Sequence, residues 1–104
     1  MPVGALGRLV SLIANIAPPT QVLNGQVTIA APRVPLAGVA TPCKSVTLVN
    51  LTTNAIAYVG NATVTAANGA YLLPGGSISL DIDDLSKVYV TGTVGNIIGW
   101  VAAN

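Results

Sequence analysis

Residues 58–92 read YVGNATVTAANGAYLLPGGSISLDIDDLSKVYVTG, a stretch in which short apolar runs are separated by turn-forming residues. Asn68-Gly69 and Pro74-Gly75-Gly76 mark turns, because glycine and asparagine tolerate the positive φ angles that tight hairpins require. Over residues 77–83 apolar and polar side chains alternate, which places one set on each face of a strand. The stretch therefore predicts antiparallel strands joined by short hairpins.

The same pattern extends in both directions, over residues 44–104. Turn signals recur there at short intervals, as all-β folds require. The apolar positions hold Val, Ile, Leu and Ala, and the chain contains no Phe, which suits a thin, closely packed β layer. We predict an all-β fold, a small antiparallel β-sandwich or barrel. The expected strands are 45–51, 56–59, 62–66, 70–73, 77–83, 87–91 and 97–102.

Residues 1–43 have a different composition and hold six of the seven prolines. Proline fixes φ and lacks the amide N–H, so a central strand is not expected here. Apolar side chains recur at helical spacing over residues 3–16, which predicts a short helix. One short strand is expected over 27–30, after a turn at Asn24-Gly25. The sequence thus predicts an extended, apolar N-terminal arm over 1–43, beginning with a short helix, and a β domain over 44–104.

The charge composition excludes several classes of function. The chain has 104 residues, the size of one domain, and 7% of them are charged, against about 25% in an ordinary soluble domain. It contains no His and no Glu, so it has no imidazole base and no histidine metal ligand. A net charge of +1 is too small to hold nucleic acid by neutralising phosphates. We expect no enzyme activity, no cofactor, no metal site and no nucleic-acid partner.

Two further features of the sequence bear on localisation. The apolar run over 3–16 ends before Pro18-Pro19, short of the roughly 20 residues that a transmembrane helix needs. Arg8 lies inside this run rather than before it, which disfavours a signal peptide, and we expect no membrane partner.

Cys43 is the only cysteine, so no intrachain disulfide can form, and we interpret it as a small, semi-buried residue.

The scarcity of ionic side chains predicts that neighbouring chains cover much of the surface. Basic residues lie in or next to the arm, whereas residues 45–104 hold one Lys against three Asp, which favours an arm that docks on an acidic surface. Tyr58, Tyr89 and Trp100 fit either the edge of the core or an interface, and with Tyr71 they are candidates for sugar stacking. The candidate interface residues are Leu6, Arg8, Leu9, Ile13, Ile16, Arg33, Tyr58, Tyr89 and Trp100.

The acidic residues and two glycosylation sequons each allow a functional and a purely structural interpretation. Asp81 and Asp83 share one face of the predicted strand and could bind an ion or act as an acid–base pair. The glycine and the terminal Glu of a calcium loop are missing, which favours a solvated strand end instead. Asn50-Leu51-Thr52 and Asn61-Ala62-Thr63 fit the glycosylation pattern, but without a secretion signal we interpret both asparagines as turn residues.

The strand and turn pattern resembles that of small virion proteins of tailed bacteriophages. The residues that carry the resemblance are Val59-Gly60, Val64-Thr65-Ala66, Gly69, Leu73-Pro74-Gly75-Gly76-Ser77 and the alternating run over 78–83.

This resemblance implies a structural protein. The expected role is a capsid decoration (cement) protein that binds the major capsid protein and itself, as a homotrimer, on the capsid surface of the virion. Such a protein is assembled in the cytoplasm of the host bacterium. The alternative is a tail, neck or fibre component with a receptor-binding module that recognises glycans.

Overall fold

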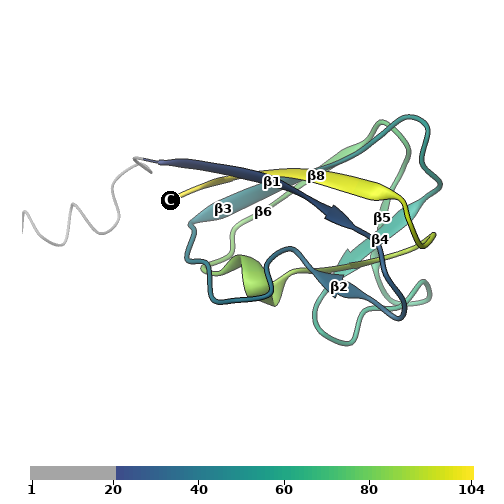
Figure 1. Ribbon diagram of the computed structural model, residues 1–104, viewed down its shortest axis with the longest axis horizontal. Coiled ribbons are helices and arrows are strands. Elements are labelled where there is room, and N and C mark those ends of the chain that lie inside the picture. Colours follow the sequence, from purple (N-terminus) through teal and green to yellow (C-terminus); the bar gives the residue numbers. More distant parts are fainter. Residues whose placement is uncertain (1–20) are drawn as a thin grey trace, which may run out of the picture.

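The computed structural model describes residues 21–104, which form two four-stranded antiparallel sheets stacked face to face (Figure 1). The order of strands is β1-β8-β3-β6 in sheet A and β2-β7-β4-β5 in sheet B. A single turn of 3-10 helix, η1, lies between β6 and β7. The strands are β1 (Val22–Thr28), β2 (Val34–Pro35), β3 (Ser45–Asn50), β4 (Ala57–Gly60), β5 (Ala70–Leu72), β6 (Ser77–Leu80), β7 (Tyr89–Thr91) and β8 (Ile97–Ala103), and η1 spans Leu85–Lys87.

This order of strands is that of an eight-stranded jelly roll, in which successive strands alternate between two sheets except that β4 and β5 both lie in sheet B. The predicted all-β sandwich is confirmed. Sheet A has β1 and β6 at its edges, and sheet B has β2 and β5. Pro35 lies on the edge strand β2, where its missing N–H removes no bond from the interior of the sheet.

The N-terminal part of the chain differs from the prediction of an arm over 1–43. Strand β1 pairs with β8 over its full length, and β2 pairs with β7, so residues 22–28 and 34–35 belong to the two sheets. The strand predicted over 27–30 is longer and begins earlier, and Asn24-Gly25 lies within it rather than in a turn. The helix predicted over 3–16 lies outside the described residues.

Residues 62–66 form turns and not the predicted strand, because local side-chain hydrogen bonds compete with a sheet ladder. The Asn61 Oδ1 accepts from the Thr63 N–H at 2.9 Å, and the Asn68 Oδ1 accepts from the Thr65 N–H at 2.7 Å. The loop is anchored by Val64, which is 2% exposed. The other predicted strands are present, with two changes of bounds. The strand predicted over 77–83 ends at Leu80, so Asp81 and Asp83 lie beyond it, and the strand predicted over 87–91 begins at Tyr89, because Lys87 belongs to η1.

The core lies between the sheets and is aliphatic. Alternate residues of each strand point inward, so that β3 buries Val46, Leu48 and Asn50 while its other side chains face outward. The core consists of small and medium apolar side chains that form one buried cluster. The residues of this cluster are Ile29, Leu36, Cys43, Val46, Leu48, Ala57, Val59, Leu72, Leu85, Val88, Val90, Ile98 and Ala102.

Trp100, the only tryptophan, packs against this cluster from β8 and lies opposite Gly25 of β1. A Cβ atom at Gly25 would lie 2.7 Å from the Trp100 Cζ2, so only glycine leaves room for the indole ring. The indole Nε1 is buried and has no hydrogen-bond partner in residues 21–104. Packing over Gly25 therefore holds the ring, and this explains a glycine in the middle of an extended strand.

Asn50 is fully buried and connects the two sheets. Its Nδ2 donates to the carbonyl oxygens of Ala55 at 3.0 Å and Leu72 at 2.9 Å, and Leu72 belongs to β5 of sheet B. Its Oδ1 accepts from the Nδ2 of Asn54 at 2.8 Å, which also donates to the Ile97 carbonyl at 2.7 Å. The residue interpreted as a turn asparagine therefore ends β3 and joins three strands.

We predict that Asn50→Ala lowers the free energy of unfolding by about 2–4 kcal/mol, because it leaves the buried Leu72 carbonyl and the part-buried Ala55 carbonyl without their donor. Urea denaturation of both proteins measures the loss. Asn24→Ala is the matched control, since Asn24 is exposed on β1, and a change within about 0.5 kcal/mol is expected. Equal effects of the two substitutions would contradict the role of the buried amide.

We predict that Gly25→Ala displaces the Trp100 ring, costs about 1–3 kcal/mol of stability and shifts the tryptophan fluorescence to longer wavelength. Gly99→Ala on the neighbouring strand is the control, because nothing lies within 4 Å of a Cβ at that position. Emission spectra and thermal unfolding of the two variants test the prediction. It is wrong if Gly25→Ala keeps the spectrum and stability of the original protein.

Candidate interaction surfaces

All three tyrosines of the chain lie on the outer side of sheet B. Tyr58 of β4 pairs with Tyr71 of β5 and Thr91 of β7, and Tyr89 pairs with Gly60. Val59 and Val90, which alternate with them, are buried, so these tyrosines point away from the core. We call this surface, formed by Tyr58, Tyr71, Tyr89 and Thr91, the tyrosine face.

The tyrosine face contains an edge-to-face pair of rings. The centroids of Tyr58 and Tyr71 are 5.4 Å apart and their planes meet at 82°. Tyr71 is 69% exposed, so the pair presents a free aromatic surface. Beside it lies an open pocket of about 610 Å³, lined by Ala55, Ile56, Tyr58, Ala66, Pro74, Thr91, Gly92 and Thr93. Apolar walls with two threonines suit an aromatic or sugar ring more than a charged ligand.

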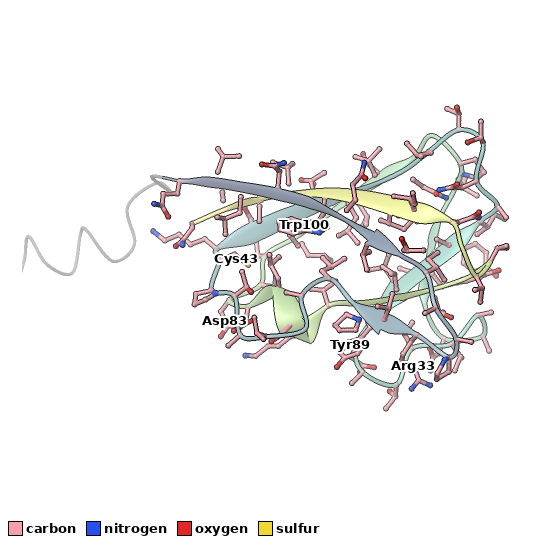
Figure 2. All side chains as sticks on the ribbon, in the orientation of Figure 1. Arg33, Cys43, Asp83, Tyr89 and Trp100 are labelled. Carbon is pink, nitrogen blue, oxygen red and sulfur yellow. The ribbon has the colours of Figure 1, made fainter. Side chains whose placement is uncertain are left out.

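Two of the predicted interface residues have roles inside the molecule. The Nε of Arg33 donates to the Val64 carbonyl at 3.0 Å, which ties the chain before β2 to the loop over 61–69. Trp100 is half-buried and packs against the core cluster from β8. Figure 2 shows Arg33 near the end of the sandwich opposite to Asp83. The predicted interface residues Leu6, Arg8, Leu9, Ile13 and Ile16 lie outside the described residues.

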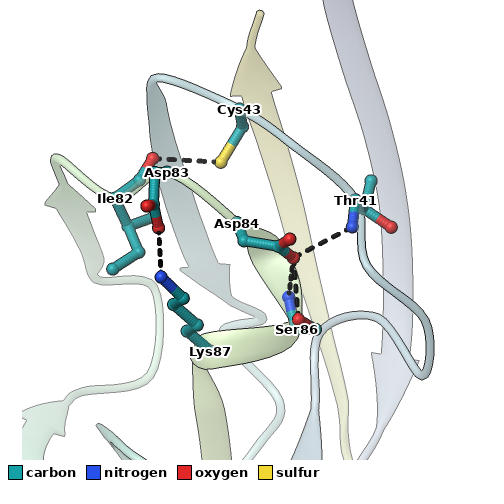
Figure 3. A network of polar contacts seen from close by, with 7 residues as sticks. All are labelled: Thr41, Cys43, Ile82, Asp83, Asp84, Ser86 and Lys87. Atoms are coloured by element: carbon teal, nitrogen blue, oxygen red, sulfur yellow. Dashed lines mark hydrogen bonds and ion pairs between the residues drawn. The ribbon is translucent and has the colours of Figure 1, made fainter.

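Asp83 and Asp84 lie at the end of the sandwich that carries η1 (Figure 3). The Asp84 Oδ1 accepts from the Thr41 N–H at 2.9 Å, and from the N–H and Oγ of Ser86 at 2.9 and 2.7 Å. The Thr41 bond, followed by the two Ser86 bonds, lowers the pKa of Asp84. Asp84 is thus the N-cap of η1 and fastens the chain before β3 to it.

Asp83 and Lys87 form an ion pair of 2.8 Å between side chains that are more than half exposed. The hydrogen bond to Asp83 and its charge raise the pKa of Lys87. An exposed pair of this kind adds little stability. Within residues 21–104 no group of three metal-ligating side chains is present, and Asp81 and Asp83 are not brought together with a third ligand.

Cys43 is buried at the same end, and its thiol donates to the Ile82 carbonyl at 3.2 Å (Figure 3). Burial, then the charges of Asp84 and Asp83, raise the pKa of the Cys43 thiol. The thiol is therefore protonated at neutral pH, and this environment opposes the thiolate that nucleophilic chemistry needs.

The outer face of sheet A is a second surface, which sequence reasoning missed. Val22, Val49 and Val101 are 74%, 41% and 44% exposed there, and Gly99 lies among them with open space above it. The Oγ atoms of Thr47 and Ser79 are 2.8 Å apart on the same face. The signal in the sequence is the lack of any charged residue in the four strands of this sheet.

No family model and no curated protein matches the sequence. Among solved structures the chain is similar to one described by the words "Bacillus endospore appendages form a novel family of disulfide-linked pili", with 15% identity and a TM-score of 0.47. The similarity covers 80% of this chain and 85% of that chain. At this identity it concerns the all-β fold alone. No helix within residues 21–104 has the length and apolar composition to cross a membrane.

We predict that Asp84→Asn lowers stability at pH 7 and that the difference from the original protein shrinks as the solution is acidified. Because folding lowers the pKa of Asp84, its contribution is fully present above the unfolded-state value of about 3.9 and is lost as the pH falls through the lower folded value. Urea midpoints measured from pH 7 to pH 2 test this.

Asp81→Asn is the control, since Asp81 is exposed near the same end of the molecule and a change in stability within about 0.5 kcal/mol is expected at pH 7. A loss for Asp84→Asn that stays constant down to pH 2 would contradict the role of the ionised carboxylate.

Proposed function

We propose that the protein is a structural subunit of a larger protein assembly, and that its specific role is decoration of the head of a tailed bacteriophage. The observation that supports an assembly role is the distribution of charge. None of the eight strands contains Asp, Glu, Lys or Arg, and the charged residues in 21–104 all lie in the connecting segments.

A face without ionic groups can be covered by another protein at low cost, because burying a charge costs several kcal/mol unless it is paired. The outer face of sheet A has this property and also exposes Val22, Val49 and Val101. Contact cores between proteins are similarly depleted of charge. Such a face suits a lasting contact between subunits more than exposure to water.

The specific role rests on the resemblance of residues 58–92 to small virion proteins. Jelly rolls occur in viral capsid and lectin domains, which is an analogy of fold and not of site. In this proposal the partners are the major capsid protein and further copies of the chain, on the capsid surface. Many weak contacts over several subunits would then give strong attachment through avidity.

A second candidate is a receptor-binding module of a tail, neck or fibre. The pair formed by the exposed Tyr71 and the half-buried Tyr58 beside the pocket favours it, because aromatic rings stack on sugars and Thr91 and Thr93 supply hydroxyl groups nearby. The Thr91 Oγ1 already donates to the Pro32 carbonyl at 2.7 Å, which leaves its oxygen as an acceptor.

We predict that Val101→Lys weakens attachment to decoration-free heads at least about tenfold, because the contact would have to bury an unpaired ammonium group. Co-sedimentation of purified protein with heads measures attachment, and circular dichroism confirms that the variant is folded. Val94→Lys makes the same chemical change at a residue that is 64% exposed in the loop before β8, and it is expected to bind as the original protein does.

Equal binding of the two variants would contradict a contact through sheet A. Absence of attachment by the original protein, together with glycan binding that Tyr71→Ala abolishes, would favour the receptor-binding alternative.

A further inference from the structure

We propose that two copies of the chain pair through their β1 strands, antiparallel, about a two-fold axis at Gly25. Sheet A of one copy would then continue into sheet A of the other. This inference deepens the proposed assembly role by naming the first contact between copies.

The outer edge of β1 is an open row of backbone donors and acceptors. Among residues 21–104 only β8 pairs with β1, which lies at the edge of sheet A (Figure 1). Gln21 and Asn104 exchange both backbone hydrogen bonds, at 3.0 and 2.9 Å, just before the strand.

Antiparallel pairs alternate between bonded and non-bonded, so Leu23, Gly25 and Val27 also bond to β8. The residues between them aim their N–H and C=O groups at the open edge. These residues are Val22, Asn24, Gln26 and Thr28.

This edge carries none of the features that normally prevent pairing with another chain. Proteins protect edge strands with charges, proline, bulges or short length. Strand β1 has seven residues, no charge and no proline, and its register with β8 runs without a bulge. The other edges are protected, since β2 has two residues and contains Pro35, β5 has three residues, and β6 has four and is followed by Asp81.

The open edge is complementary to itself. With Gly25 on the axis, residues pair across the contact when their numbers sum to fifty, so Val22 faces Thr28 and Asn24 faces Gln26 of the second copy. All four residues whose N–H and C=O groups aim at the open edge then meet residues of the second copy that do the same. Each such pair exchanges two backbone hydrogen bonds. The paired side chains are neutral, so no like charges meet.

The inner side of the strand supports the same pairing. Leu23 would lie beside Val27 of the second copy, and both are only half-buried in the single chain. Gly25 meets Gly25 beneath the half-buried Trp100 rings, where a larger residue could not fit. Completing the sheet would cover the exposed parts of these side chains and remove the open edge. The occupant is therefore a second copy, and the contact closes with two chains in place of the trimer that the resemblance implies.

Cross-linking between two single variants tests the register. Val22→Cys and Thr28→Cys place thiols on positions that face each other across the axis, at about 5.5 Å between Cα atoms, within the range that a disulfide spans. Two copies of the same variant hold their new thiols about 20 Å apart, six residues along the strand. We expect a disulfide-linked dimer when the variants are mixed under mild oxidation and none with either variant alone. Cys43 is buried and common to all samples.

Native mass spectrometry tests the backbone contact. The original protein is expected at twice the chain mass of 10.4 kDa. Gln26→Pro removes an N–H that points to the second copy but none that bonds β8, and we expect at least tenfold weaker dimerisation. Gln26→Ala keeps the N–H and is expected to dimerise normally.

A monomer or trimer mass for the original protein, or no cross-link in the mixture, overturns the proposal, as does equal weakening by the two Gln26 variants. A dimer that cross-links as expected but does not attach to heads refutes decoration and leaves the β1 contact standing.

Discussion

The sandwich depends on a buried amide that joins its two sheets. Asn50 ends the central strand β3 and holds carbonyls of sheet B and of the following turn through its Nδ2, while Asn54 holds its Oδ1 and reaches the start of β8. The core is otherwise built from aliphatic side chains, which fill space without fixing direction. A fully satisfied polar group at this point defines how the two sheets are aligned.

The opposite end of β3 is fastened by charge instead. Asp84 accepts three hydrogen bonds, from Thr41 and Ser86, and joins η1 to the segment that leads into β3. The hydrogen bonds of Asn50 at one end of β3 do not depend on pH, whereas those of Asp84 at the other end depend on ionisation of its carboxyl group. The two ends of the sandwich therefore respond differently to acid, although both restrain the same strand.

No strand carries a charged side chain, so the surface divides into charged segments between the strands and uncharged faces of the sheets. The segments around Lys44, Asp83 and Lys87 provide ionic groups at one end, where water can solvate them. The sheets present valine, threonine, serine and tyrosine without ionic groups. The charged side chains and the uncharged faces of the sheets thus lie in different regions, which is the physical basis for the proposed assembly role and for the proposed pairing along β1.

The sequence by itself determined the all-β class and most of the strands. Alternation over 77–83 and the turns at Asn68-Gly69 and Pro74-Gly75-Gly76 depend on local conformational preferences, which act within a few residues. It also determined the lack of imidazole chemistry and the shortage of charge, since these are matters of composition.

Only the tertiary structure decided the roles of Asn24-Gly25, Asn50 and Trp100. Asn24-Gly25 has the local signature of a turn, but pairing with β8 and the indole above Gly25 override it. Asn50 has the signature of a turn asparagine, and only the approach of β5 from the other sheet buries it. The positions of the tyrosine face and of the open edge of β1 likewise follow from strand order, which joins residues far apart in the chain and has no local signal.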